Sequence, residues 1–261
     1  MSIPTIGLTI IVGLGVLFGA LFWLCLSIRN FGFVDVAWSY GFTPVAASCL
    51  FLQNGWLERK VMIALMASIW SIRLGTHLFR RVLRHHPEED GRYQTLRKEW
   101  GSHLRRSFFL FFEFQALLIV ALSAPFLIAC NNPTPALSGL EIAACILWIL
   151  AVAGEAMADW QMDRFKASRP KGGEVCQVGL WRYSRHPNYF FEFLIWCSFS
   201  LFALASSWGW VSLYCPALML FFLFRVTGIP ATEAQAIRSK GEAYREYQRT
   251  TSVFIPWFYK V

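Results

Sequence analysis

The segment Gly179-Leu-Trp-Arg-Tyr-Ser-Arg-His-Pro-Asn-Tyr189 concentrates the side chains most able to do chemistry. Its two arginines present planar forks of N–H donors, which suit phosphates and carboxylates. It runs directly into an apolar stretch from Phe190 to Ala205. A polar cluster at the mouth of a membrane helix is costly to maintain, and this favours a binding site. A basic loop held only by lipid headgroups is the alternative, but it does not account for His-Pro-Asn-Tyr beside the arginines.

Composition indicates the kind of element that must position this segment. Hydrophobic residues make up 56% of the chain and charged residues 15%, whereas soluble domains average about 25% charged residues. A helix needs about 20 apolar residues to cross the hydrocarbon core. The sequence therefore predicts an all-α integral membrane bundle of seven transmembrane helices, at about residues 4–28, 33–52, 61–82, 107–129, 138–158, 189–206 and 209–226.

The basic residues predict the orientation. If the N-terminus lies outside, most of the 24 Lys and Arg lie on the cytoplasmic side, and only Arg59 and Lys60 fall in an outer loop. This is the positive-inside pattern, so we expect the C-terminus in the cytoplasm. The formal charge of +8 then reflects topology, and no nucleic-acid partner is expected. The seven scattered Cys have no C-x-x-C spacing, and His85, His86 and His103 fall in a predicted solvated loop, so no metal site is expected.

Ionisable side chains recur at the cytoplasmic ends of the predicted spans, which indicates a polar pocket between helices. A set of cations could clamp a polyanion: Arg73, Arg84, Lys166, Arg182, Arg185 and Arg225. A set of acids, with Asn188, could hold sugar hydroxyls or an amide: Glu155, Asp159, Glu192 and Glu233. A dinucleotide or adenosyl cofactor fits this chemistry, and the apolar interior would hold a lipid-like substrate. Glu113 and Glu141 stand apart, and each could equally be a structural ion pair.

Asp35 is the only carboxyl within the apolar interiors of the first three predicted spans. A protonated carboxyl there could donate a hydrogen bond to a substrate carbonyl, as a general acid does. Tyr40, in the same span, could share that role. The alternative is that Asp35 pairs with Arg73 and holds two helices together.

Three segments carry a resemblance to a known family. The stretch from Gly179 to Glu192 resembles the C-terminal signature of steroid 5-alpha-reductases and their bacterial relatives. The stretches Arg92–Gly101 and Val34–Gly41 resemble the bacterial branch. The resemblance covers about residues 30–257 and implies seven helices that enclose NADPH from the cytoplasmic side and reduce an activated C=C bond of a steroid or other enone. It implies one domain over 1–261, with cofactor binding in about 138–257, acting as a monomer in the bacterial inner membrane on a lipophilic substrate among membrane lipids.

The resemblance also implies roles for individual residues. The nucleotide contacts of the family fall on Glu155, Asp159, Lys166, Tyr183, Asn188, Glu192 and Arg225, and a second group falls on Arg73, His77 and Arg84. Asp35 falls where eukaryotic reductases carry a catalytic Glu. The polar segment adds four candidate cofactor-binding residues, Arg182, Arg185, His186 and Tyr189. Glu233 is a fifth. The chain departs from the family at Trp70, where a catalytic Tyr is expected, and at Glu155, where an Asn is expected.

Two other classes of protein remain open. Membrane methyltransferases that use S-adenosylmethionine on isoprenoid or phospholipid substrates share Arg185-His-Pro-Asn-Tyr189 and a C-terminal pattern that Glu233 and Gly241-Glu-Ala-Tyr-Arg-Glu-Tyr247 match. They lack the Asp35 and Arg92–Gly101 features. A passive lipid-binding or transport protein is a third possibility, but such a site needs few hydrogen-bonding groups.

Overall fold

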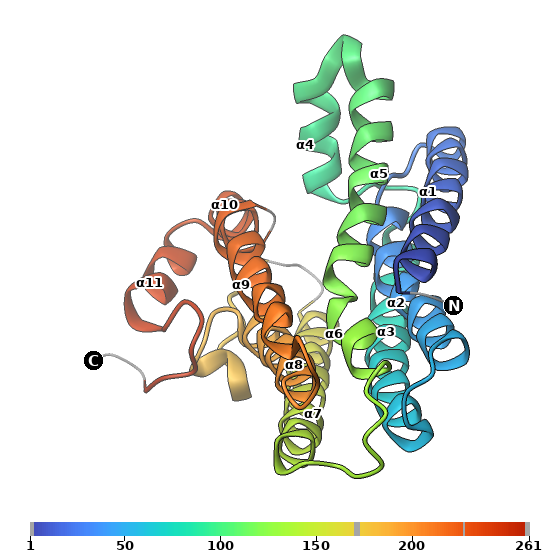
Figure 1. Cartoon of the computed structure of the whole chain (residues 1–261). Coiled ribbons are helices and arrows are strands. Elements are labelled where there is room, and N and C mark those ends of the chain that lie inside the picture. The colour runs from blue at the N-terminus through green and yellow to red at the C-terminus, as the bar shows by residue number, and fades with distance from the viewer. Residues whose placement is uncertain (1–2, 170–172, 227, 259–261) are drawn as a thin grey trace. The chain divides into compact units, whose positions relative to one another are not determined.

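The computed structural model describes residues 3–169, 173–226 and 228–258, with side chains from Thr5 onward. In this part of the chain all regular elements are helices, as the sequence predicts, and the one β-type contact is an isolated bridge between Ser184 and Ser252 (Figure 1). The chain divides into two compact units. Unit 1 comprises Met1–Glu141 and Phe202–Ser212, and unit 2 comprises Ile142–Leu201 and Leu213–Val261. The single domain over 1–261 stays a prediction.

Unit 1 contains six α-helices: α1 (Ile3–Ile28), α2 (Phe33–Leu52), α3 (Leu57–His85), α4 (Gly91–Trp100), α5 (Leu104–Leu122) and α6 (Ala124–Ala129). A short turn at Gly101–His103 joins α4 to α5 as a helical hairpin, and α1 packs along α5 (Figure 1). Buried aromatic rings hold this end together, because Phe31 stacks on Phe108 with ring centroids 3.7 Å apart. The polar segment between α3 and α5 therefore contains a helix, α4.

Helices α2 and α3 are joined by close packing and by hydroxyl groups. Gly75 of α3 leaves room for the ring of Tyr40, because a Cβ at this position would lie 2.8 Å from that ring. The Thr43 hydroxyl donates to Ser71 Oγ at 2.8 Å, and the Ser71 hydroxyl donates to the Ser39 carbonyl oxygen at 2.6 Å. Small residues and side-chain hydroxyls are the usual means by which helices associate in membranes.

Arg59 organises the loops at the other end of unit 1. This arginine is 2% exposed and donates to the Glu141 carboxylate and to the carbonyl oxygens of Asn132, Thr134 and Ala136. Glu141 is fully buried and also accepts from the Ser138 backbone N–H at 2.7 Å. Every charge in this pair is compensated, so of the two possibilities for Glu141 the structure shows a structural ion pair.

Unit 2 is built from α7 (Gly139–Ser168, entering from unit 1), α8 (Pro187–Ala203), α9 (Tyr214–Phe221), α10 (Ile229–Lys240) and α11 (Glu242–Thr250). Gly154 allows α7 to approach α8, because a Cβ there would lie 2.4 Å from the Phe191 ring. Gly241 separates α10 from α11 with φ of 58°, a left-handed conformation that favours glycine. The apolar core under α10 consists of Leu223, Ile229 and Phe254.

The chain is a multi-pass membrane protein. Among the described residues, five helical segments are long and apolar enough to cross a bilayer: Thr5–Ile28, Leu57–His85, Gly91–Ala129, Gly139–Ser168 and Gly209–Lys240. The other two predicted spans, 33–52 and 189–206, are also helical, as α2 and α8. α8 has 17 residues, which gives a length of roughly 26 Å. That is slightly short for a hydrocarbon core about 30 Å thick.

Candidate functional site

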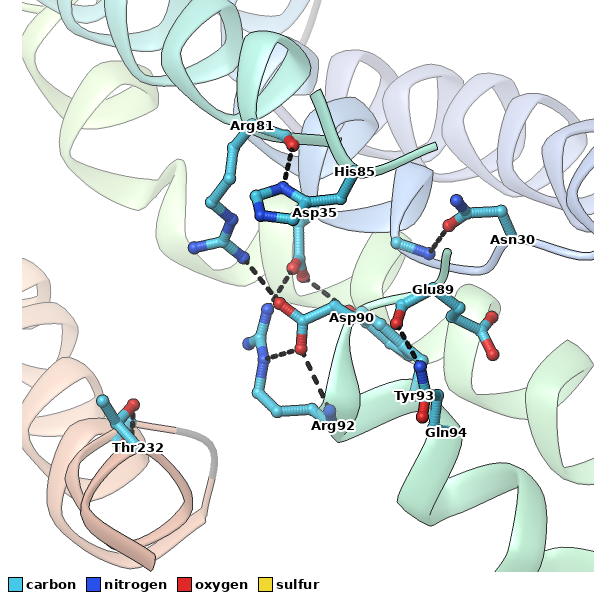
Figure 2. Close-up of polar contacts among 12 residues, drawn as sticks. Asn30, Asp35, Arg81, His85, Glu89, Asp90, Arg92, Tyr93, Gln94 and Thr232 are labelled. Carbon is cyan, nitrogen blue, oxygen red and sulfur yellow. Dashed lines mark hydrogen bonds and ion pairs between the residues drawn. The ribbon is translucent and has the colours of Figure 1, made fainter. Parts of the chain in front are cut away.

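Asp35 lies in the first turn of α2 and is held by two donors from α4. Its Oδ2 accepts from Arg92 Nη2 at 2.7 Å, and its Oδ1 accepts from the Tyr93 hydroxyl at 2.7 Å (Figure 2). Asp35 is 27% exposed and Arg92 is 29% exposed, whereas Tyr93 is buried. The sequence suggests an acid deep in an apolar interior. The structure instead places Asp35 at a helix end with a cation, and a guanidinium contact suits a carboxylate better than the neutral acid of the predicted role.

Two further acids fix α4 beside Asp35. Asp90 caps α4: its Oδ1 accepts from the Arg92 backbone N–H at 3.0 Å and its Oδ2 accepts from Arg81 Nη2 at 3.1 Å (Figure 2). Burial alone would raise the pKa of Asp90, but Arg92, its backbone N–H and Arg81 outweigh burial and hold that pKa below its usual value. Glu89 accepts from Arg97 Nε at 3.0 Å and from the Phe31 backbone N–H at 2.7 Å. We call Asp35, Glu89, Asp90, Arg92 and Tyr93 the α4 cluster.

Tyr40, the second predicted catalytic residue, lies on the face of α2 that packs on α3. Its hydroxyl oxygen is 2.9 Å from Thr76 Oγ1, and either group can be the donor. If Thr76 donates, the Tyr40 hydroxyl keeps its own proton for an acceptor on a substrate. Tyr40 is half-buried, so the structure leaves this predicted role open.

Arg185, one of the two arginines of the polar segment in unit 2, donates to acceptors within the protein. Arg185 Nε donates to Glu233 Oε1 at 2.7 Å, and its Nη1 donates to the carbonyl oxygens of Gln248 and Thr251 at 2.9 and 2.6 Å. The Gln248 amide donates to Glu233 Oε2 at 2.7 Å. These bonds join the loop before α8 to α10 and to the end of α11. We call Arg185, His186, Glu233 and Gln248 the C-terminal clamp.

His186 and Tyr189 extend the clamp. His186 Nε2 lies 3.3 Å from Glu233 Oε1, and the imidazole stacks on the Tyr189 ring with centroids 5.3 Å apart. The Tyr189 hydroxyl lies 3.2 Å from Thr232 Oγ1. The buried Tyr247 hydroxyl donates to the carbonyl oxygens of Trp181 and Ser184. Burial raises the pKa of Tyr247, so the phenol stays a neutral donor.

Three predicted acids of unit 2 are buried on α7 and α8. Glu155 is 3% exposed, Asp159 8% and Glu192 7%. Gly154 of α7 contacts Phe191 of α8. The acids that follow them in sequence, Glu155 and Glu192, therefore lie at the same height along the two helices. The 179–182 turn packs on the same part of α7, because the Trp181 indole N–H donates to the Ala158 carbonyl oxygen at 2.9 Å. Glu192 also accepts from the Trp196 indole N–H at 2.9 Å.

The remaining predicted residues differ in exposure. In unit 2, Lys166, Arg182, Tyr183 and Arg225 are exposed, and Asn188 is half-buried. In unit 1, Arg73 and His77 are half-buried on α3, and Arg84 is exposed near its end. Exposed cations are accessible to a ligand from solvent, whereas Arg185 is not. Among the residues described, no group of three or more His, Cys, Asp and Glu is placed to hold a metal ion.

Sequence reasoning missed four polar partners that the structure supplies: Arg92, Tyr93, Thr232 and Gln248. Arg92 and Tyr93 were noticed only as part of a family-like stretch. A signal was present, because Glu89-Asp90 precedes Arg92-Tyr93 in a segment with helical periodicity. An acid at a helix start caps that helix, which would have placed these residues on one rigid element.

Comparison with known proteins gives a family and a distant relative. The chain is 28% identical over 273 aligned residues to "Uncharacterized protein C594.04c" of Schizosaccharomyces pombe, and the alignment covers 92% of this chain and 76% of that protein. No solved structure matches the chain. The sequence profile of the family described as "Protein of unknown function (DUF1295)" matches residues 21–251. The chain therefore belongs to the DUF1295 family.

Proposed function

We propose that this protein is an NADPH-dependent membrane reductase that adds a hydride to the activated C=C bond of a lipophilic enone, steroid-like in size. In this proposal seven helices cross a bacterial inner membrane, with the N-terminus outside and the C-terminus in the cytoplasm. The positive-inside distribution of Lys and Arg supports the orientation. The resemblance of 179–192, 34–41 and 92–101 to steroid 5-alpha-reductases and their bacterial relatives supports the chemistry.

One observation carries the proposal: unit 2 buries three carboxyls beside the ordered 179–189 segment. Ionisable groups near membrane depth mark functional sites by default, and this supports a polar site at Glu155, Asp159 and Glu192. Carboxylates accept hydrogen bonds from ribose hydroxyls and from an amide, and the exposed Arg182 and Arg225 suit phosphates. These groups fit NADPH. In the proposal Arg185 and His186 hold the segment in shape and do not contact the cofactor.

When bound, NADPH supplies the hydride, and the protein must stabilise the charge that develops on the substrate oxygen. We assign that task to the Tyr40 hydroxyl, with Thr76 donating to it. A donor positioned before reaction in an apolar site lowers the barrier because it needs no reorganisation. Asp35 is then a positioning residue, which holds Arg92 and Tyr93 and through them α4 against α2.

The test is Tyr40→Phe, which removes the hydroxyl and keeps the ring that packs on Gly75. With progesterone as the enone, NADPH consumption by the purified protein should fall by about 10²–10³-fold in turnover, with NADPH affinity unchanged. Thr43→Val is the matched control, because it removes another α2–α3 hydroxyl bond and should leave turnover unchanged. Equal losses in both variants would assign Tyr40 to helix packing.

Cofactor binding is measured separately in unit 2. Arg225→Ala should weaken NADPH binding by about 1.5–3 kcal/mol, the range for a charge-assisted contact. Arg249→Ala removes another exposed arginine, from α11, and should not change the NADPH affinity. Wild-type protein that fails to bind NADPH would end the reductase proposal.

A methyltransferase using S-adenosylmethionine is the second candidate, and the C-terminal clamp favours it. Arg185, His186 and Glu233 form one bonded network, and Tyr247 reaches the same loop. These are the residues shared with the membrane methyltransferase pattern. The Asp35 and Arg92 features have no role in this alternative. Binding of S-adenosylmethionine without binding of NADPH would select it.

A further inference from the structure

Glu113 is an acid at membrane depth whose role neither cofactor nor fold accounts for. It lies on α5, in the candidate membrane-spanning segment Gly91–Ala129. Seven residues separate it from Arg106, roughly 10 Å along a helix axis. A glutamate side chain cannot span that distance to reach the headgroups. Ionisable groups at such depth mark functional sites by default.

The carboxyl lies in the seam between α5 and α1. A Cβ on Gly15 would be 3.3 Å from Glu113 Oε2, and a Cβ on Gly19 would be 3.4 Å from Glu113 Oε1. Both oxygens therefore rest on α1 backbone at two glycines one turn apart. A Cβ at Gly15 would require the carboxyl to shift by a few tenths of an ångström, and a Cβ at Gly19 would be in van der Waals contact with it.

Among the described residues, Glu113 has no hydrogen-bonding or ionic partner, and the helices around it offer none. α1 contains no charged residue, and neither does α6. α2 contains one, Asp35, which is bound to Arg92 and Tyr93. The charged residues of α4 and of the first turn of α5 lie at the other end of the seam. Glu141, the other isolated acid, has Arg59.

The surface beside Glu113 is apolar and open. Leu110 and Leu117, one turn before and after it on α5, are 55% and 54% exposed, and Val16 on α1 is 71% exposed. Glu113 itself is half-buried. The seam is thus an exposed apolar surface that carries one carboxyl.

We propose that this seam binds the polar end of a single lipophilic molecule through the Glu113 carboxyl in its neutral form. The ligand class is a long-chain alcohol or another uncharged amphiphile with a hydroxyl group. A neutral acid donates and accepts with a hydroxyl, which satisfies both groups. A cationic ligand would have to lose its hydration far from the headgroups, where desolvating two charges costs more than their attraction returns.

The test uses dicyclohexylcarbodiimide, a lipophilic reagent, on the full chain in lipid nanodiscs. The neutral acid adds to the reagent: its proton goes to one nitrogen, its oxygen bonds to the central carbon, and the acyl group then shifts to nitrogen as a stable acylurea. Mass spectrometry should map an adduct to Glu113 that is absent in Glu113→Gln. A water-soluble carbodiimide should give little adduct at Glu113. Preference for the water-soluble reagent, or no adduct from either, would overturn the neutral lipid-facing carboxyl.

Competition identifies the ligand. Hexadecanol should slow formation of the adduct roughly fivefold more than hexadecane, which is the preference that one hydrogen bond gives. Equal protection by both, or stronger protection by hexadecylamine, would overturn the hydroxyl assignment. Glu113→Gln with Gln115→Glu is the matched control, because it moves the acid two residues along α5 and away from Gly15 and Gly19. It should react without selective protection by the alcohol, and the same protection there would overturn the role of the seam.

Discussion

The α4 cluster and the C-terminal clamp use the same groups, a carboxylate with an arginine and a hydroxyl or amide, in different settings. In the clamp, Arg185 is 10% exposed, Glu233 15% and His186 3%. In the α4 cluster, Arg92 and Asp35 are 29% and 27% exposed. The clamp arginine also binds two backbone carbonyl oxygens. The same kind of ion pair is therefore mostly buried in one unit and more open in the other.

This difference separates structural charges from candidate functional ones. A mostly buried pair whose arginine also binds backbone carbonyl oxygens stabilises one arrangement of its loop, and removing one partner leaves the other charge poorly compensated. A partly exposed pair contributes little to stability, and its groups stay accessible to a ligand. We therefore assign fold maintenance to the clamp.

Breaking the clamp should have the largest effect on stability. Arg185→Ala leaves Glu233 without its main partner and should lower the free energy of unfolding by about 3 kcal/mol, at the lower end for a buried pair. Thermal unfolding of the detergent-purified protein measures this. Glu242→Ala breaks an exposed pair with Arg249 and should leave the melting temperature unchanged. A stable Arg185→Ala protein that has lost NADPH affinity would instead restore the cofactor role predicted from the sequence.

Variants of the α4 cluster should change the free energy of unfolding less than variants of the clamp. Asp35→Asn keeps an acceptor for Tyr93 and loses only the ionic part of the contact, so it should cost about 1 kcal/mol or less. Tyr93→Phe removes a buried hydrogen bond and should cost about 1 kcal/mol. Both are measured by the same unfolding assay. If Asp35→Asn destabilises the protein as much as Arg185→Ala, the two networks have the same role and the distinction fails.

The elements were more predictable than the partners. Long apolar runs correctly indicated α1, α3, α5 and α7, and α7 continues past the predicted end at 158 to Ser168. These follow from local periodicity. The count of seven spans rests on α2 and α8, where Ser39, Tyr40 and Thr43 in α2 and the 17-residue length of α8 weaken the signal.

The contacts of the charged residues could not be read from the sequence. Arg185 resembles a phosphate ligand until its acceptors are known, and two of them are backbone carbonyl oxygens, which no residue pattern encodes. The partner of Asp35 is 57 residues away, on a helix whose position depends on the Asp90 cap and on Glu89. Side-chain identity predicted that these sites would be polar, whereas tertiary packing decides which partners each side chain has.

Lowering the pH should destabilise the α4 cluster, because Asp90 becomes protonated. The folded-state pKa of Asp90 lies below its usual value, chiefly because Arg92 and its backbone N–H outweigh the effect of burial. A carboxyl whose pKa is lowered in the folded state contributes stability that is fully present above the unfolded pKa of about 3.9. This stability is lost as pH falls through the folded pKa.

Hydrogen exchange of the α4 amides should therefore accelerate below about pH 4, relative to the same amides at neutral pH after correction for intrinsic rates. Asp90→Asn keeps a capping side chain without the titrating charge, so its exchange should be faster at neutral pH and should lack this added acid dependence. An identical acid response in the variant would remove Asp90 as the acid-sensitive group.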